Sequence, residues 1–455
     1  LHHPKSCIKE AQELLADAYG VKHSFFAVNG TSGAIQAMIM SVIKAGEKIL
    51  VPRNVHKSVS AGIILSGSEP VYMNPEIDEN LGIALGVKPQ TVENMLKQDP
   101  DIAAVLAEKF EDIENDEEVS VVVETIGGTE AAYDFVKRAL LKGKNVVTSN
   151  KALVEMYGSE LLRIAKEKNV AFLFEASVGG GIPLIRTIGD AFAGEVIKEI
   201  DGILNGTTNY ILTCMTEEGQ SFEEALHKAQ ELGYAERNPE ADIEGYDTGR
   251  KIAILSSLAC KKEVKFSDIY TEGISKIEKV DLDYAKQMSM AIKLCGSATV
   301  DDNGDIAAYV CPMMLDRDNP LYMVKGVFNA ILLEGNMLGR TMLYGSGAGK
   351  LPTASAVVSD ILSIIKLGNN RLPIEWSEER AKVLPMDKTS HRYFIRFKDV
   401  DDKHITRCRR AFADSEVIRL EGLDEFAILT GYIREKDFNL VSESLDDIIK
   451  FIRVR

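Results

Sequence analysis

One lysine follows a group of acidic residues in the stretch AQELGYAERNPEADIEGYDTGRK, residues 229–251. Asp247 and Lys251 are four residues apart, so on a helix they share a face, and an acid N-terminal to a base at this spacing attracts it. On a solvated surface such a pair contributes only about 0.3 to 0.5 kcal/mol. The next residues, IAILSSLAC, are apolar nearly all round, which predicts a buried helix. Because a buried ion pair is costly to keep, we predict acid–base chemistry at Asp247 and Lys251.

Histidine usage narrows the groups that can transfer protons. Between residues 107 and 390 the only histidine is His227, which lies in the amphipathic stretch FEEALHKAQEL and is expected on a helix surface. Proton transfer in this region therefore falls to lysine, carboxylate or water. A buried lysine can do this work, since burial disfavours its charged form. The candidates are Lys251 and Lys151, which follows a predicted strand in TSNKALV. The alternative for Lys151 is a surface lysine at a helix N-terminus, but a cation is slightly unfavourable there, which favours a functional role.

Three glycine-rich turns could bind a ligand. VNGTSGA (28–34) joins a strand to a helix, so its N–H groups with Thr31 and Ser32 could hold a phosphate. ETIGGTEA (124–131) follows a strand at the edge where open α/β sheets bind ligands. YGSGAGKLPTA (344–354) is not a P-loop, because leucine follows its lysine. For each turn, a structural bend that needs positive φ remains an equal alternative.

Composition excludes several classes of partner. The net charge of -16 would repel nucleic acid and anionic lipid, and no apolar run is long enough to span a bilayer. We therefore expect a cytoplasmic protein whose partners are small molecules or copies of itself. The six cysteines are scattered without metal-site or redox spacing and are expected to be mostly core thiols. The chain begins with leucine, from which we expect an upstream part.

The first 106 residues alternate between helical and strand patterns, which predicts an α/β layer with a mostly parallel sheet. The expected helices cover residues 6–18, 32–44, 55–66 and 89–97, and the expected strands cover residues 24–28, 48–51, 70–73 and 102–106. The acidic stretch EKFEDIENDEE that follows is expected to be exposed.

A second alternating unit predicts half of a doubly wound nucleotide-binding fold. Its expected strands are 119–125, 145–149 and 170–176, and its expected helices are 130–142 and 158–168. An α+β pattern then runs to about residue 330, a helix is expected at 352–366, and Pro373 and Pro385 bracket a linker around Trp376. The tail suits a split-βαβ module, with strands at 392–397, 416–420 and 426–430 and a last helix at 443–450.

From about residue 107 to 455 the chain resembles homoserine dehydrogenase. The resemblance is carried by VETIGGTEAAYDFVKRALLKGKNVVTSNKAL, FEASVGGGIP, GILNGTTNYIL, residues 229–251 and GNMLGRTMLYGSGAGKLPTASAV. It implies an oxidoreductase that interconverts L-homoserine and L-aspartate 4-semialdehyde with NADP or NAD, in threonine, methionine and isoleucine biosynthesis. It also implies a homodimer or homotetramer.

The resemblance also implies roles for individual residues. Lys251 would give or take the proton at the substrate oxygen, and Asp247 and Glu236 would hold homoserine, with Asp242 in support. Lys151 would lie between nicotinamide and substrate, while Thr125 and Gly347, within the loop 345–349, would touch the cofactor. A structural sodium ion would be bound largely through backbone oxygens of residues in EASVGGGI. These residues are Glu175, Val178, Gly180 and Ile182.

Residues 1 to about 106 resemble the start of the large domain of pyridoxal-phosphate (PLP)-dependent ornithine, lysine and arginine decarboxylases. LHHPKSCIKEAQELLADAYG, FFAVNGTSGAIQAM, KILVPRNVHKSV and GIALGV carry this resemblance. It would make Thr31 and Ser32 phosphate ligands and His56 the residue that stacks on the pyridine ring. No segment matches the lysine that forms the Schiff base, so we expect neither decarboxylation nor a PLP cofactor.

The seam near residues 106–110 lacks the opening strand and G-x-G-x-x-G turn of the dehydrogenase family. Loss of two or three charge-assisted hydrogen bonds at about 1.5 to 3 kcal/mol each would weaken cofactor binding by about 10² to 10⁶. The alternatives to an impaired dehydrogenase are a catalytically dead fusion product, a PLP-binding decarboxylase-like module, and an improvised nucleotide site in residues 1–106.

The expected fold class is α/β with four parts. These are a PLP-transferase-like fragment (1–106), half a Rossmann-type NAD(P) unit (107–178, with 330–372 returning to it), an α+β substrate and dimerisation domain (179–330) and a ferredoxin-like, ACT-like module (390–455). The usual glycine turn of that module is missing from RFKDVDDKHITRC, so threonine feedback is not expected.

Overall fold

The computed structural model of the chain divides into two compact units, residues 1–119 and 120–455, each treated by itself below. The structure describes residues 39–40, 43–53, 55, 57–74, 77–78, 83–84, 89–105, 119–126, 128–368, 374–398, 401–412, 414–445 and 447–455. The glycine turn with Thr31 and Ser32, the residue His56, and the seam at 106–110 lie outside the described residues. So do the predicted elements at 6–18 and 24–28 and the acidic stretch before residue 119.

The first unit contains a small parallel sheet in the order β2-β1-β5. Its described elements are β1 (Lys48–Pro52), α3 (Lys57–Ser66), β2 (Glu69–Met73), β3 (Ile77–Asp78), β4 (Ile83–Ala84), α4 (Pro89–Gln98) and β5 (Ile102–Val105). These bounds confirm the strand and helix pattern predicted from residue 48 onward. Its core joins α3 to the central strand β1 through Val59, Ile63, Ile49 and Val51.

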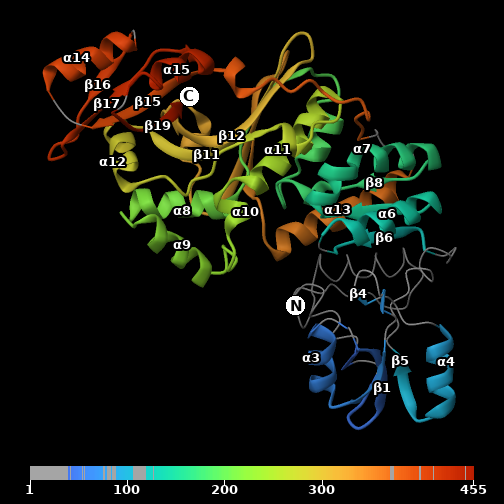
Figure 1. Cartoon of the computed structure of the whole chain (residues 1–455). Helices are drawn as coiled ribbons and strands as arrows, with labels where there is room; N and C mark the ends of the chain where they lie inside the picture. Colours follow the sequence, from blue (N-terminus) through green and yellow to red (C-terminus); the bar gives the residue numbers. More distant parts are fainter. Residues whose placement is uncertain are drawn as a thin grey trace, which may run out of the picture. The chain divides into compact units, whose positions relative to one another are not determined.

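The second unit begins with a three-stranded parallel sheet in the order β6-β7-β8 (Figure 1). Its elements are β6 (Val121–Glu124), α6 (Glu130–Leu141), β7 (Asn145–Thr148), α7 (Lys151–Lys168), β8 (Phe172–Leu173) and the 3-10 helix η1 (Glu175–Ser177). Ile361 and Ile364 of α13 (Lys350–Leu367) pack into the core beneath this sheet with Val147 and Leu173. A segment almost 200 residues downstream thus covers the nucleotide-type sheet, as α/β layers require.

Two predictions in this sheet were wrong in extent. The helix α7 begins at Lys151 instead of residue 158, because Asn150 caps it by accepting a hydrogen bond from the backbone N–H of Leu153. The strand expected over 170–176 is only Phe172–Leu173. The chain leaves the strand as η1, where the backbone N–H of Glu175 donates to Asp360 of α13 instead of to a neighbouring strand.

The remaining residues build one large mixed sheet. Its main path runs in the order β14-β13-β9-β11-β12-β19-β15-β17-β16, with β10 beside β12 and β18 beside β15. The elements before the C-terminal module are the π-helix η2 (Thr187–Ala191), β9 (Ile197–Ile203), α8 (Gly206–Glu217), α9 (Phe222–Glu231), α10 (Glu240–Ile243), α11 (Tyr246–Cys260), η3 (Phe266–Asp268), β10 (Tyr270–Thr271), α12 (Lys279–Gln287), β11 (Ala291–Val300), β12 (Ile306–Leu315), η4 (Pro320–Met323), β13 (Phe328–Gly335) and β14 (Gly339–Ser346).

The C-terminal module has the chain order and sheet order of a split-βαβ fold. It comprises η5 (Met386–Lys388), β15 (Ser390–Lys398), α14 (Asp402–Ala411), β16 (Glu416–Ile418), β17 (Glu425–Leu429), β18 (Ile433–Arg434), α15 (Glu435–Ser442) and β19 (Ile448–Val454). The helix predicted at 443–450 was wrong, since α15 ends at Ser442 and β19 begins at Ile448. The residues IIKFIRV are β-branched and aromatic, and they pair with β15 on one side and β12 on the other.

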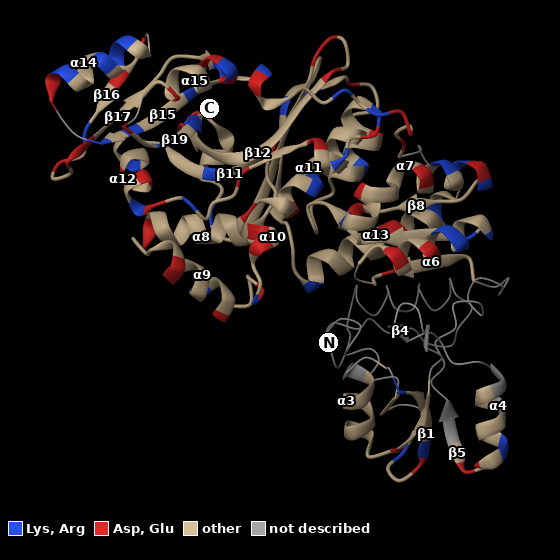
Figure 2. Cartoon of the chain, in the orientation of Figure 1, with Lys and Arg blue, Asp and Glu red and all other residues tan. Residues whose placement is uncertain are grey.

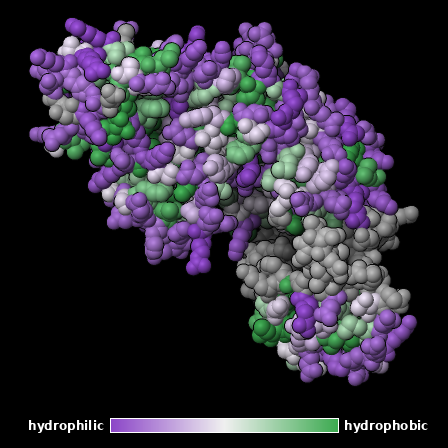
Figure 3. All heavy atoms as spheres, viewed as in Figure 1, coloured by the Kyte–Doolittle hydropathy of each residue, from purple (hydrophilic) through white to green (hydrophobic). Residues whose placement is uncertain are grey.

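The strand β19 therefore joins the module to the large sheet. Within it, Arg453 is buried and donates to Glu435 of α15 and to Glu272 beside β10. Lysine and arginine side chains gather on α14 at the outer side of the module (Figure 2). Hydrophilic residues cover most of the described surface on the face in Figure 3. Among the described residues, none of the helices combines the length and apolarity that a bilayer span requires.

The cysteines behave as the sequence predicted. Of the five in the described residues, all are free, four are buried and Cys260 is partly exposed. Cys7 lies outside the described residues.

Candidate functional site

The helix α11 carries the predicted acid–base pair, and its sequence explains why the pair is buried. Gly245, at φ +81°, turns the chain into the helix, and Lys261, at φ 59°, ends it. Between them α11 packs against β11, β12 and α7 (Figure 1). Gly249 lies under the ring of Phe266, which a Cβ atom at this position would overlap. The prediction of a buried helix over IAILSSLAC is confirmed.

Asp247 and Lys251 form the pair expected from their spacing. Lys251 Nζ donates to Asp247 Oδ2 at 2.7 Å and to the backbone oxygen of Leu204 at 2.7 Å. A second cation, Lys151 at the first turn of α7, lies with its Nζ 3.0 Å from Asp247 Oδ1. One buried carboxylate thus binds both predicted lysines.

The charges around Asp247 determine its protonation state. Burial alone would raise the pKa of Asp247, but the charges of Lys251 and Lys151 and hydrogen bonds from Lys251 and Asn205 outweigh it. The net result is a pKa well below the usual aspartate value. Asp247 is therefore ionised at neutral pH and balances two positive charges.

Asp242 lies beside this group, on α10. It accepts a hydrogen bond from Asn205 Nδ2 at 2.7 Å. Burial raises the pKa of Asp242, the bond from Asn205 opposes this rise, and the negative charge of Asp247 adds to it. The structure thus brings together Lys151, Lys251, Asp247 and Asp242, all of which the sequence analysis selected.

Glu236 is not part of this cluster in the structure. It is exposed in the loop before α10, and its backbone oxygen accepts a hydrogen bond from Gln230. Among the described contacts none joins its carboxylate to Lys251 or Asp247. His227 is exposed on α9, as predicted, and lies near Glu231.

Two asparagines were missed by the sequence analysis. Asn205 follows β9 and caps α8, and its amide contacts both Asp242 and Asp247. Asn150 follows β7 and caps α7, and its amide donates to the backbone oxygens of Ile126 and Gly128. The signal was available, since an asparagine between a strand and a helix is a preferred N-cap.

The edge of the β6-β7-β8 sheet carries Thr125, a predicted cofactor-binding residue. Glu124, at the end of β6, is buried and accepts hydrogen bonds from Thr148 Oγ1 and from the backbone N–H of Ile126. Burial raises its pKa, and these hydrogen bonds oppose the rise. They hold the strand ends together and leave Thr125 exposed at the carboxyl edge, where α/β sheets bind ligands.

The glycine loop after β14 packs closely against Asn329 of β13 and against the loop 179–181. Gly347 is buried, and a Cβ atom on it would overlap the amide of Asn329. Gly180 lies at φ +56°, and a Cβ atom there would lie 2.6 Å from the carbonyl group of Gly347. The loop 345–349 and the loop 179–181 therefore have room only for glycine at these two positions.

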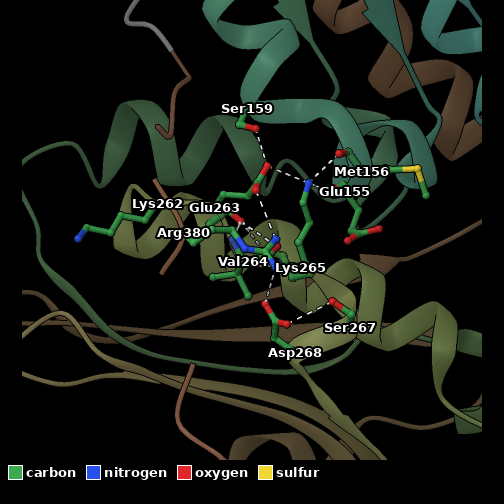
Figure 4. A network of polar contacts seen from close by, with 12 residues as sticks. Glu155, Met156, Ser159, Lys262, Glu263, Val264, Lys265, Ser267, Asp268 and Arg380 are labelled. Carbon is green, nitrogen blue, oxygen red and sulfur yellow. Dashed lines mark hydrogen bonds and ion pairs between the residues drawn. The ribbon is translucent and has the colours of Figure 1, made fainter. Parts of the chain in front are cut away.

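A polar network joins the first half of α7 to the C-terminal end of α11 (Figure 4). Glu263, just after α11, accepts from Ser159 of α7 at 2.5 Å and forms an ion pair with Lys265 at 2.8 Å. Lys265 also donates to the backbone oxygen of Met156. Arg380, from the linker, reaches both Glu263 and Asp268. This network fixes the helix with Lys151 against the helix with Lys251.

A cavity of about 690 Å³ lies away from this cluster, beside α7 and Trp376. Three basic residues line it, Arg163, Lys166 and Lys261, and of these Lys166 and Arg163 are paired with Glu375 and Glu378. None of its lining residues belongs to the acid–base group.

Sequence comparisons match two families. Residues 183–362 match the homoserine dehydrogenase family, and residues 1–154 match the Orn/Lys/Arg decarboxylase major domain. The second match continues past the predicted seam, although residues 120–154 lie in the second compact unit. Strand–helix alternation with a parallel sheet is common to both families, which makes this boundary hard to place from pattern alone.

Individual relatives agree with the first match. A homoserine dehydrogenase of Synechocystis sp. is 36% identical over 416 residues, which cover 85% of this chain and 94% of the relative. One of Bacillus subtilis is 38% identical over 361 residues, covering 76% and 82%.

Solved structures are similar as well. The crystal structure of a homoserine dehydrogenase from Thiobacillus denitrificans superimposes with a TM-score of 0.71 at 30% identity, covering 91% of this chain and 99% of that one. A hyperthermophilic archaeal homoserine dehydrogenase in complex with NADPH gives a TM-score of 0.51 at 27% identity, covering 72% and 100%. With the buried lysine–aspartate cluster in place, the comparisons show that this chain belongs to the homoserine dehydrogenase family of oxidoreductases.

Proposed function

We propose that the chain interconverts L-homoserine and L-aspartate 4-semialdehyde with NADP or NAD, as a step in the biosynthesis of threonine, methionine and isoleucine. The observation that carries this proposal is the buried contact of Asp247 with both Lys151 and Lys251. No other buried carboxylate among the described residues is contacted by two lysines of the candidate site. A site with two cations and a fixed anion suits a substrate whose oxygen gains or loses charge.

Lys251 is the residue that moves the proton. Its ammonium group has three donors, and two of them are directed to Leu204 and Asp247. The third donor is available for the substrate oxygen. In the direction of aldehyde reduction, Lys251 gives a proton to that oxygen; in the direction of alcohol oxidation, it takes the proton back.

The other lysine and the acids hold the substrate. Lys151 is 39% exposed and paired with Asp247, and it would lie between the nicotinamide and the substrate. Asp247 and Asp242 would hold the hydroxyl and amino end of the substrate, and Glu236 would contribute from its exposed loop. Because no contact among the described residues joins Glu236 to the lysine–aspartate cluster, its contribution should affect mainly substrate binding.

The nicotinamide coenzyme would supply or accept the hydride. Thr125, Lys151 and Gly347 would hold its nicotinamide end. The fit is supported by the exposed position of Thr125 at the carboxyl edge of the sheet, and by Asn329, whose buried amide has no hydrogen-bond partner among the described residues. The missing G-x-G-x-x-G turn would weaken the hold on the pyrophosphate, so we expect impaired affinity for the coenzyme.

A structural sodium ion would be bound by backbone oxygens of Glu175, Val178, Gly180 and Ile182. In this turn the backbone N–H groups of Ser177 and Ile182 donate to the carbonyl oxygens of Phe174 and Gly179. These two acceptors are not among the four oxygens proposed to bind sodium. The carboxylate of Glu175 caps the following helix through the N–H groups of Ile185 and Arg186. Among the described residues no group of three or more histidine, cysteine or acidic side chains is placed to bind a metal, so backbone oxygens would have to do so.

The domain assignment is part of the same proposal. We assign residues 107–178 and 330–372 to the coenzyme-binding domain, 179–330 to the substrate domain, and 390–455 to an ACT-like module. Residues 1–106 are assigned to a decarboxylase-like fragment, a proposal based on their sequence, in which Thr31, Ser32 and His56 would not serve a cofactor. The exposed side chains of Met342, Tyr344 and Phe328 near the edge strand β14 support a homodimer or homotetramer built on this sheet.

The test is a direct assay. Purified chain is given aspartate semialdehyde with excess NADPH or NADH, and the loss of reduced coenzyme is followed. We expect turnover that falls by about 10² to 10⁴ in Lys251→Ala, as for loss of a general acid or base. Lys261→Ala, at the exposed end of the same helix, is the matched control and should keep wild-type turnover. Equal turnover in wild type and Lys251→Ala would refute the assignment.

A further inference from the structure

We infer that Asn205 is a positioning residue for the reaction, because its side-chain amide bridges the carboxylates of Asp242 and Asp247. This inference rests on the proposed function, since it assigns a role within the same site. The amide nitrogen donates one hydrogen to Asp242 Oδ1 at 2.7 Å and the other to Asp247 Oδ2 at 2.9 Å. Asn205 is 5% exposed.

The orientation of this amide is fixed by the fold. Asn205 is the N-cap of α8, and its Oδ1 accepts the backbone N–H of Thr208 at 2.9 Å. Because that bond needs an acceptor, the oxygen must face the helix and the NH₂ group must face the two acids. Aspartate or serine would cap α8 as well as asparagine, but neither would present two hydrogens to the carboxylates.

The corner between β9 and α8 contacts every group of the cluster except Lys151. The backbone oxygen of Leu204 accepts from Lys251, and the next residue, Asn205, binds the two acids. The lysine that moves the proton and the acids that hold the substrate are therefore aligned by two adjacent residues. A change at Asn205 should alter the spacing of both acids relative to Lys251.

The bridge also keeps two like charges close together. Asp242 from α10 and Asp247 from α11 repel each other, while Lys251 on α11 and Lys151 on α7 attract both. Hydrogen bonds from Asn205 favour the ionised form of each acid. Without them, burial and mutual repulsion would raise the pKa values of the two acids.

Two substitutions separate the bridge from the cap. Asn205→Ser keeps the cap and removes both hydrogen bonds, and we expect kcat/KM to fall by about 10 to 100-fold. Asn205→Asp keeps the cap but places a carboxylate oxygen, which can only accept, opposite the carboxylates of Asp242 and Asp247. We expect a fall at least as large, with the acidic limb of the kcat/KM profile moved to higher pH. Asn319→Ser, at the cap of the distant η4, is the control and should leave both measurements unchanged.

A measurement without substrate distinguishes this inference from the proposed function. In Asn205→Asp the new carboxyl has a raised pKa in the folded protein, so its destabilising effect grows as pH rises above its unfolded pKa. The loss of thermal stability relative to wild type should therefore be larger at about pH 8 than at about pH 5. Asn205→Ser adds no carboxyl group, so its loss should change less between the two pH values than that of Asn205→Asp.

The outcomes lead to different conclusions. A wild type that does not turn over aspartate semialdehyde, with this stability pattern intact, would refute the proposed function and leave the bridge standing. An active wild type with both Asn205 variants unchanged in kcat/KM and pH profile would overturn the positioning role. Equal stability losses of Asn205→Asp at the two pH values would overturn the bridge itself.

Discussion

Lys251 Nζ lies 2.7 Å from Oδ2 of Asp247, which precedes it by one turn of the same helix. The side chain of Lys251 is only 10% exposed and that of Asp247 only 8%. An ion pair at this depth is rare unless it is well compensated, because both charges lose their hydration. Here the compensation comes from Lys151, Asn205 and the backbone oxygen of Leu204. The pair is thus part of a polar group that several separate elements must supply.

Replacing Asp247 by asparagine should lower the free energy of unfolding by about 3 kcal/mol at neutral pH, since it leaves two lysines without their shared anion. Chemical denaturation with circular dichroism measures this. Asp134→Asn, which removes the exposed partner of Arg138, is the control and should change stability by less than about 1 kcal/mol. A loss no larger than the control's would contradict the assigned electrostatics.

The stability difference between wild type and Asp247→Asn should depend on pH. The pKa of Asp247 is lowered in the folded protein, so its contribution is fully present above its unfolded pKa of about 4. It is lost as pH falls through the lower folded pKa. Denaturation curves of the two proteins should therefore differ constantly at neutral pH and converge below about pH 4. Curves that stay parallel in acid would show that the pKa is not lowered.

Gly249→Ala should destabilise the protein although alanine favours a helix by about 1 kcal/mol. Its Cβ atom would overlap the ring of Phe266, and we expect a net loss of about 1 to 3 kcal/mol. Gly194→Ala, with open space at its Cβ position, should stay within about 0.5 kcal/mol of wild type. The double variant with Gly249→Ala and Phe266→Ala should lose less stability than the sum of the two single losses, because the overlap is removed. A loss equal to that sum would count against the overlap.

Glu263→Gln should loosen the network that joins α7 to α11. Glu263 binds Ser159, Lys265 and Arg380, and loss of its charge should cost about 1.5 to 3 kcal/mol. Glu378→Gln, whose partner is the half-exposed Arg163, is the matched control and should have little effect. Hydrogen exchange in the first half of α7 and at the end of α11 would reveal the loosening, and unchanged protection there would argue against a joining role.

The sequence by itself determined the chemistry-bearing residues of α11. A four-residue spacing places Asp247 and Lys251 on one face, and the apolar run after them can only be buried, so local periodicity was enough. It also determined the strand and helix pattern from residue 48 to 105, where each element is regular. It did not determine the end of the chain: a helix was expected at 443–450, but residues 448–454 are recruited as β19 by two neighbouring strands.

Only the tertiary structure decided which groups share the site. Lys151 contacts Asp247 because α7 packs against α11. Asn205 contacts Asp242 and Asp247 because the residues after β9 lie beside α10 and the start of α11. Glu236, which lies in the same sequence stretch as the other acids, stays outside in an exposed loop. Contacts within one helix turn follow from the sequence period, whereas contacts between residues 37 to 96 positions apart depend on how whole elements pack.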